Sequence, residues 1–323
     1  MLYHAGEPLV FDSGTSSYVI PEWHTYYHTT KAHSTIMVGG QGQGKRLAGK
    51  ISGYGGVSGC GLIVADATAP YEGLLRRFIR RVCFLGQRYY CIVDELIKNA
   101  PLPDSGEPVP SGKPGSRGAH APAPPEPPEA QPRGPFEWLL HYDGHLTEQS
   151  DGVFLIKKGD ARLLVQMMEP GTVRWSIEQG FRATHEDFSL GQTPEEKRAS
   201  LERADYLKVS PVEDGERQVF CAVLYPLVEG EAVPEFSPVR EGNWVGIQVR
   251  RGGETDLVAL RGPGSRRLGP RGIETDAKML ALTVGEEGTV QRCVIDRGSL
   301  LRVEGAVISV NPAGGTVSIG DAV

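Results

Sequence analysis

The amino-acid sequence predicts an all-β fold, a large antiparallel β-sandwich with little helix. Glycine (42 residues) and proline (24 residues) are frequent and divide the chain into short segments. These segments are rich in β-branched residues and alternate apolar with polar positions, as half-buried strands do. Many short strands separated by turn residues are typical of sandwiches. We expect helix in under about a tenth of the residues, well below the usual globular share.

The expected strands run along the whole chain. They are Leu9–Phe11, Thr35–Val38, Leu62–Ala67, Leu74–Phe84, Tyr89–Glu95, Phe136–Tyr142, Val153–Lys157, Ala161–Met168, Gln218–Tyr225, Trp244–Arg250, Asp256–Arg261, Met279–Val284, Val290–Asp296, Ser299–Val303, Ala306–Asn311 and Thr316–Ile319. One segment, Pro194–Asp205, reads as a short surface helix, because Thr193 and Glu196 have the spacing of a capping box.

We expect one sandwich domain over residues 1–236 and a continuing β-strand region over residues 237–323. Residues 101–135 interrupt the first domain with a segment rich in Pro, Gly, Ser and Glu, which holds few residues able to form a core. We interpret it as an expanded, disordered loop between two strands of one domain. The alternative is a linker between two domains.

Composition limits the classes of function. With a net charge of −6, the chain lacks the general basic character that binding to nucleic acid requires. No apolar run approaches the length of a membrane span, and the first residues lack the pattern of a signal peptide. The five cysteines show no CxxC or metal-type spacing, so we predict no disulfide framework, with Cys83 and Cys91 as buried apolar residues.

Asp12 and His33 are the candidate metal ligands. Each stands at the end of an apolar run, and a carboxylate with an imidazole suits zinc, which needs a third protein ligand. Two structural readings remain open. Asp12 is also placed to cap its own turn, and His33 could be a structural histidine bonded to a strand carbonyl.

The loop between these two residues holds the candidate substrate-binding residues. Flat rings and cations suit a sugar acid, since rings stack on pyranose faces while Lys and His meet carboxylates or sulfates. The candidates are Trp23, Tyr26, Tyr27, His28 and Lys31. The alternative is that the two tyrosines only pack the loop onto the sandwich.

Other titratable residues are assigned structural roles. Asp94 and Glu95 are consecutive in a strand, so they face opposite sides and cannot form a catalytic dyad; we expect one of them to pair with Arg80 or Arg88. His141 is assigned to the core at the end of a strand.

The same stretches resemble a known family, the heparinase II/III-like polysaccharide lyases. The match covers roughly the first 230 residues and rests on many positions in fixed order. They are Asp12, Gly14, Thr15, Ser17, Tyr18, Tyr26, Tyr27, Thr30, Ala32, His33, Thr35, Val38, Gly40 and Gln43, followed by Arg80–Val82, Tyr90, Val93–Leu96, Trp138–His141 and Val223–Pro226.

The resemblance implies cleavage of a uronic-acid-containing glycan by β-elimination, with Asp12 and His33 as zinc ligands and His33 or Tyr27 as candidate catalytic residues. It also implies a periplasmic or secreted location. In the family the third zinc ligand belongs to a G-H-x-H-A-D run upstream of this stretch, and a helical toroid domain supplies most of the catalysis; the sequence given contains neither. We therefore expect an acidic polysaccharide and that helical domain as partners, and no turnover by this chain alone. The alternative is a non-catalytic carbohydrate-binding or architectural module.

Overall fold

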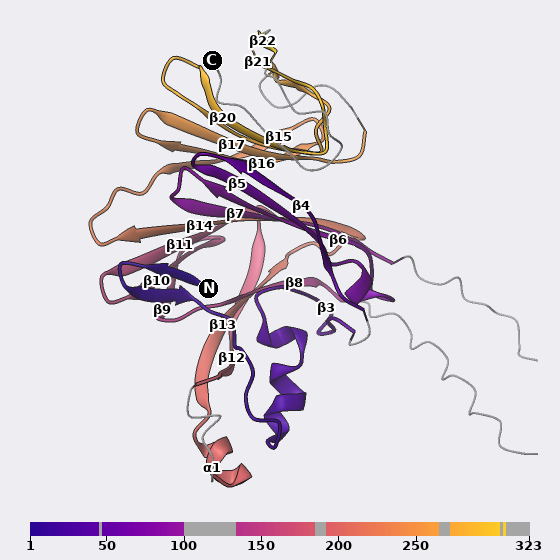
Figure 1. Ribbon diagram of the computed structural model, residues 1–323, viewed down its shortest axis with the longest axis vertical. Coiled ribbons are helices and arrows are strands. Elements are labelled where there is room, and N and C mark those ends of the chain that lie inside the picture. The colour runs from indigo at the N-terminus through magenta and orange to yellow at the C-terminus, as the bar shows by residue number, and fades with distance from the viewer. Residues whose placement is uncertain (45–46, 100–133, 185–191, 265–271, 304–305, 308–323) are drawn as a thin grey trace, which may run out of the picture.

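The structure is a computed structural model that describes residues 1–44, 47–99, 134–184, 192–264, 272–303 and 306–307 (Figure 1). Its strands form stacked antiparallel sheets, which confirms the predicted all-β sandwich. The widest sheet has eight strands and lies in the middle of the stack. In sheet order they are β4 (Lys50–Val57), β5 (Cys60–Asp66), β6 (Leu75–Leu85), β7 (Tyr89–Lys98), β14 (Arg217–Val228), β11 (Ala161–Glu169), β10 (Val153–Lys158) and β9 (His145–Ser150).

Further sheets cover this central sheet on its two faces. On one side lies a four-stranded sheet, joined by a two-stranded ribbon; on the other lies a five-stranded sheet, whose outer face packs against a three-stranded sheet. The first group is β12 (Val173–Arg182), β13 (Glu202–Pro211), β8 (Phe136–His141) and β3 (Ile36–Val38), with β1 (Leu2–His4) and β2 (Glu7–Val10). The second group is β15 (Glu235–Glu241), β16 (Trp244–Arg251), β17 (Glu254–Arg261), β19 (Met279–Val284) and β20 (Val290–Asp296), then β18 (Glu274–Thr275), β21 (Leu301–Val303) and β22 (Ala306–Val307).

Both faces of the central sheet are buried at its middle strands. Successive side chains of a strand point to opposite faces, so Phe220 of β14 packs in the core shared with the four-stranded sheet. Its neighbour Cys221 packs in the core shared with the five-stranded sheet. This explains why β14 reads as a nearly continuous apolar run. Cys83 and Cys91 are also fully buried, as expected, and all five cysteines are unpaired thiols.

The sequence missed several strands and misplaced one helix end. Strands β4, β9, β12 and β15 were missed, because β4 is rich in glycine, β9 and β15 are mostly polar, and Gln179 and Gly180 interrupt the apolar alternation of β12. The capping box at Thr193 is present, but helix α1 spans only Pro194–Ala199. Residues predicted to continue it belong to β13, where Asp205 pairs with Gln179 across the sheet. The other helices among the described residues are single turns: Trp23–Tyr27, Thr30–Ala32 and Ala69–Tyr71.

The ends of the Pro-rich segment lie together. Residues 100–133 are outside the described residues, so the expected disorder is not addressed by the structure. The Lys98 ammonium, however, donates to the carbonyl of Gly134 at 2.7 Å. Strand β7 before the segment and β8 after it lie in different sheets, on opposite sides of one core. Of the expected strand Ala306–Asn311, the described residues include Ala306–Val307, which form β22. The expected strand Thr316–Ile319 lies outside the described residues. The expected boundary after residue 236 falls inside β15.

Cutting the chain within residues 101–133 is expected to leave one folded particle. The fragment before the cut supplies β4–β7 to the central sheet and β3 to the four-stranded sheet, while the second fragment supplies the other strands of both. A protease site introduced in this segment, followed by native size-exclusion chromatography, tests the expectation. Co-elution of the two fragments supports a single domain, and elution as two folded pieces would contradict it.

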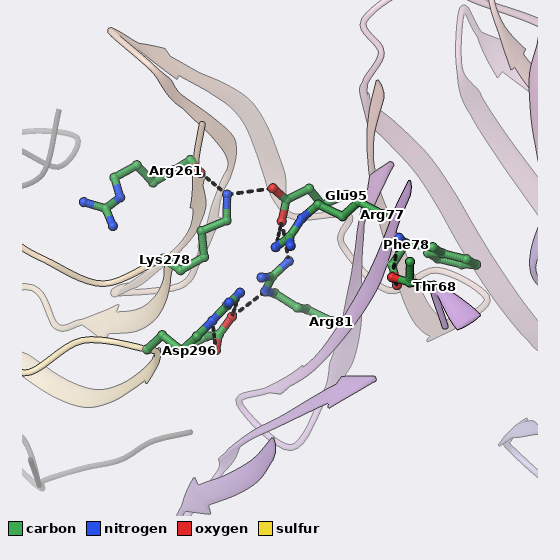
Figure 2. Close-up of polar contacts among 9 residues, drawn as sticks. Thr68, Arg77, Phe78, Arg81, Glu95, Arg261, Lys278 and Asp296 are labelled. Carbon is green, nitrogen blue, oxygen red and sulfur yellow. Dashed lines mark hydrogen bonds and ion pairs between the residues drawn. The ribbon is translucent and has the colours of Figure 1, made fainter. Parts of the chain in front are cut away.

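Buried ion pairs tie the central sheet to the five-stranded sheet. The Arg81 side chain is fully buried and donates through Nε to Asp296, the last residue of β20, at 2.7 Å. Arg81 also contacts Glu95, which accepts from Lys278 at 2.8 Å and from Arg77 at 2.9 Å (Figure 2). Burial would raise the pKa of Glu95, but these cations lower it to about 2. Five residues from two sheets, Arg77, Arg81, Glu95, Lys278 and Asp296, therefore form one charge cluster.

Asp94 faces the other side of the same strand, as predicted. Its carboxylate accepts two bonds from Arg80, at 2.7 and 2.8 Å, and it is completely buried. The expected pairing with Arg80 is confirmed. Arg80 in turn donates to the carbonyl of Ser34, just before β3, and so links the central sheet to the chain that leads into the four-stranded sheet.

Candidate functional site

The candidate site lies where the chain leaves β2. Beyond Val10 the chain runs beside the end of β8: the Phe11 N–H donates to the carbonyl of His141 at 3.2 Å. This places Asp12 next to the end of β8. The turn that follows depends on Gly14, whose positive φ of 72° suits glycine and whose N–H donates to Asp12 Oδ1 at 2.9 Å. Asp12 therefore does cap its own turn.

The second oxygen of Asp12 meets His33. His33 follows a single helical turn and precedes β3, and its Nδ1 lies 2.8 Å from Asp12 Oδ2. The two candidate ligands, 21 residues apart in sequence, are thus brought together. The side chain of Asp12 is 49% exposed and that of His33 is 41% exposed, so the pair is accessible to solvent.

Each partner favours the charged form of the other. The bond to Asp12 raises the pKa of His33, with burial opposing it and the Tyr27 carbonyl adding to it. Burial would raise the pKa of Asp12, but the bonds from His33 and Gly14 outweigh it and lower that pKa. The geometry therefore favours the ion-pair form, an imidazolium beside a carboxylate.

A third group, His141, lies behind the pair. It is fully buried, stacks on Tyr206 with ring centroids 4.8 Å apart, and its Nε2 is 3.3 Å from the Tyr26 hydroxyl. Burial lowers the pKa of His141 to about 4, against the attraction of Asp12. The sequence placed His141 correctly in the core but missed that it adjoins the site. The signal was available, since an apolar strand that ends in histidine places an imidazole at a sheet end.

The two tyrosines of the loop are buried. Trp23–Tyr27 forms a π-helical turn, and the rings of Tyr26 and Tyr27 pack with Phe181 and Ala32 in a small core of their own. The Tyr26 hydroxyl also bonds to Ser13, within 3.1 Å. Both rings therefore pack the loop onto the sandwich. A contact of either tyrosine with substrate remains a prediction.

The other loop candidates are more open. The rings of Trp23 and His28 lie against each other with centroids 3.7 Å apart, and His28 is exposed. Lys31 is half-buried, with its ammonium 5.8 Å from the centroid of the Tyr26 ring. These three side chains can present a flat surface and a cation to a ligand. Substrate binding by them is a prediction that the geometry allows.

The donor atoms of the pair fit part of a zinc site. Asp12 supplies oxygen and His33 supplies nitrogen, both accepted by zinc, and their exposure leaves room for further ligands. Among the described residues, no group of three or more His, Cys, Asp and Glu side chains is arranged to hold a metal. The structure thus brings together the two ligands expected from this chain, and its described part supplies no third.

The layered antiparallel sandwich belongs to a known family of protein domains. The model of the family described as heparinase II/III-like, C-terminal, matches residues 1–200, so the chain belongs to this family. No curated protein sequence matches. No helix among the described residues is long and apolar enough to cross a membrane.

Solved structures share the fold. A heparinase III is 14% identical with a TM-score of 0.55, and the match covers 88% of this chain and 35% of that one. A second heparinase III structure is 16% identical with a TM-score of 0.54, over 78% and 34% of the two chains. The heparan sulfate lyase HepC from Pedobacter heparinus is 14% identical with a TM-score of 0.52, over 87% and 35%. This chain thus spans about a third of the length of these relatives.

Proposed function

We propose that this chain is the β-sandwich part of a polysaccharide lyase that cleaves uronic-acid-containing glycans by β-elimination. The observation that carries the proposal is the accessible Asp12–His33 pair at the end of the sandwich, in a chain of the heparinase II/III-like family. The solved relatives named heparinase and heparan sulfate lyase support an acidic polysaccharide as the substrate class. Since such glycans are extracellular, the proposal places the full-length protein in the periplasm or outside the cell.

Elimination needs three groups held together: a base for the C5 proton, an acid for the leaving oxygen, and neutralisation of the uronate carboxylate. The bond to Asp12 raises the pKa of His33 and so favours the cationic ring over a free base while no metal is bound. In that form we assign His33 to the substrate carboxylate; with zinc bound, His33 would be a neutral ligand and the ion would meet that carboxylate. Tyr27 reaches His33 through its backbone carbonyl, so its proposed part is to orient that ring.

Zinc is the proposed cofactor, with Asp12 and His33 as two of its ligands. A bound zinc ion would add positive charge to neutralise the substrate carboxylate. Trp23, His28 and Lys31 would then form one wall of the cleft, with the rings against a pyranose face. The base and the third ligand are left to the proposed partner, a helical toroid domain.

We expect zinc to bind this chain weakly and through both residues. Two protein ligands hold zinc poorly, and His33 must give up its bond to Asp12. Isothermal titration with zinc should show weak binding that is lost in Asp12→Ala and His33→Ala but kept in the control His145→Ala, an exposed strand residue. Tight binding, or binding unchanged in His33→Ala, would contradict the proposed site.

The chain alone is expected to be inactive. Ultraviolet absorbance of the unsaturated uronate product on heparan sulfate, hyaluronan and alginate measures turnover. We expect none from this chain, and turnover when it is joined to the helical domain of a heparinase III; His33→Ala should lower that rate about a hundredfold or more. Turnover by the chain alone would place the whole active site on the sandwich. Glycan binding without turnover in the joined form would favour a non-catalytic binding module.

A further inference from the structure

Among the described residues, no strand pairs with the outer side of β4, an edge of the central sheet. Edge strands expose unpaired backbone groups, and proteins commonly protect them with charge, proline, bulges or short length. The other edges of the three larger sheets follow this rule: β9 carries Glu148, β12 carries Arg174, β15 carries Pro238, β20 carries Arg292 and β3 has three residues. Strand β4 has eight residues, KISGYGGV, with a single charge at its first position.

This edge also carries exposed apolar side chains on one face. Residues three apart on a regular strand point to opposite faces. An irregularity between Ile51 and Gly53 changes this, because Ile51 pairs with Ala65 and Tyr54 pairs with Ile63, which share a face of β5. Ile51, Tyr54 and Ile63 are 62%, 77% and 47% exposed. The bulge therefore places three apolar side chains beside this edge.

We propose that β4 is a self-association surface, and that a second copy of this chain adds its own β4 in antiparallel orientation. Two identical antiparallel strands are related by a two-fold axis, so one surface serves both copies. A register with Ile51 opposite Tyr54 of the second copy forms the aromatic–β-branched pair twice. In that register Lys50 lies opposite Gly55, so the two copies of its charge do not meet. The two central sheets then become one continuous sheet.

The oligomeric state of the full 323-residue chain tests the proposal. Light scattering after size-exclusion chromatography should show a mass that rises with concentration to twice that of the monomer. Tyr54→Lys should weaken the dimer about tenfold or more, because the substitution enters the symmetric interface twice. The matched control is Tyr3→Lys, another strand tyrosine, 62% exposed, which should dimerise as the unchanged chain does. Thermal unfolding of Tyr54→Lys should match that of the unchanged chain at a concentration where both are monomeric, which shows that the fold is kept.

Cross-linking tests the register. The five natural cysteines are buried, so an introduced cysteine reports on its own surroundings. Mixed Ile51→Cys and Tyr54→Cys chains should form a disulfide-linked pair faster than either mixed with Tyr3→Cys. A wild-type chain that stays monomeric, or a Tyr54→Lys chain that dimerises normally, would overturn the proposal. Protection of β4 amides from exchange only when a helical domain is joined would assign this edge to that domain instead, which also overturns it.

Discussion

Replacing Arg81 by methionine is expected to lower the free energy of unfolding by about 3–5 kcal/mol, the usual cost of removing one partner from a buried ion pair. Arg81 is fully buried between the central and five-stranded sheets, and without it Arg297 is the one cation left beside Asp296 among the described residues. Urea unfolding at neutral pH measures the change. Arg76→Met is the matched control: it belongs to the same strand, but its pair with Glu216 is half-exposed, so the loss should stay below about 1 kcal/mol.

A double variant separates charge from packing. If the loss arises from an uncompensated Asp296, then Arg81→Met combined with Asp296→Leu should recover much of it, because well-packed apolar residues can replace a buried pair. Glu95 retains Arg77 and Lys278 in both variants. An Arg81→Met loss no larger than that of Arg76→Met would show that the cluster does not hold the two sheets together.

The second large effect is acid sensitivity through His141. Its pKa is lowered to about 4 in the folded chain, against 6.5 for an ordinary histidine. Between these values the unfolded chain binds more protons, so folding stability falls as pH falls from about 6.5 to about 4. The difference of roughly 2.5 pKa units corresponds to about 3 kcal/mol of unfolding free energy. The folded chain has this stability above about pH 6.5 and has lost it below about pH 4.

Comparison of variants isolates this contribution. In His141→Gln, the loss of unfolding free energy between pH 7 and pH 4 should shrink by about 2–3 kcal/mol relative to the unchanged chain. His145→Gln, at an exposed strand position, should behave as the unchanged chain does. Acid-sensitive groups without a charge interaction with His141, such as Glu95, act equally in all three proteins and cancel. An equal acid loss in His141→Gln would show that His141 is not held neutral by the fold.

The sequence was most informative where burial is one-sided or complete. Apolar runs such as that of β14 located the central strands, and the opposed directions of Asp94 and Glu95 followed from strand geometry alone. Strands that are mostly polar, such as β9, gave no such signal, and the segment after Ala199 pairs with β12 instead of continuing as helix. Local propensity cannot anticipate a partner that lies distant in the chain.

The candidate site was likewise predicted in part from the sequence. Asp12 and His33 were identified by residue type and motif, and their side chains do meet. The burial of Tyr26 and Tyr27 depends on Phe181, some 150 residues downstream, so the sequence of the loop left packing and substrate contact equally open. His141 joined the site only through the pairing of the chain after β2 with the end of β8.

The central sheet also has a consequence for biosynthesis. Strand β7 ends at residue 98, and its hydrogen-bonded neighbour β14 ends at residue 228, so the ribosome adds 228 − 98 = 130 residues between them. At about 5–20 residues per second this takes on the order of 10 s. During that interval the nascent β4–β7 meander has no partner at either edge, and one face holds the thiols of Cys83 and Cys91 uncovered. The edge of β7 gains its partner once β14 has emerged, but the face with the thiols is covered only by the five-stranded sheet, whose last strand ends at Asp296. Chaperone binding to the nascent chain should therefore rise in this interval and end only once β20 has emerged.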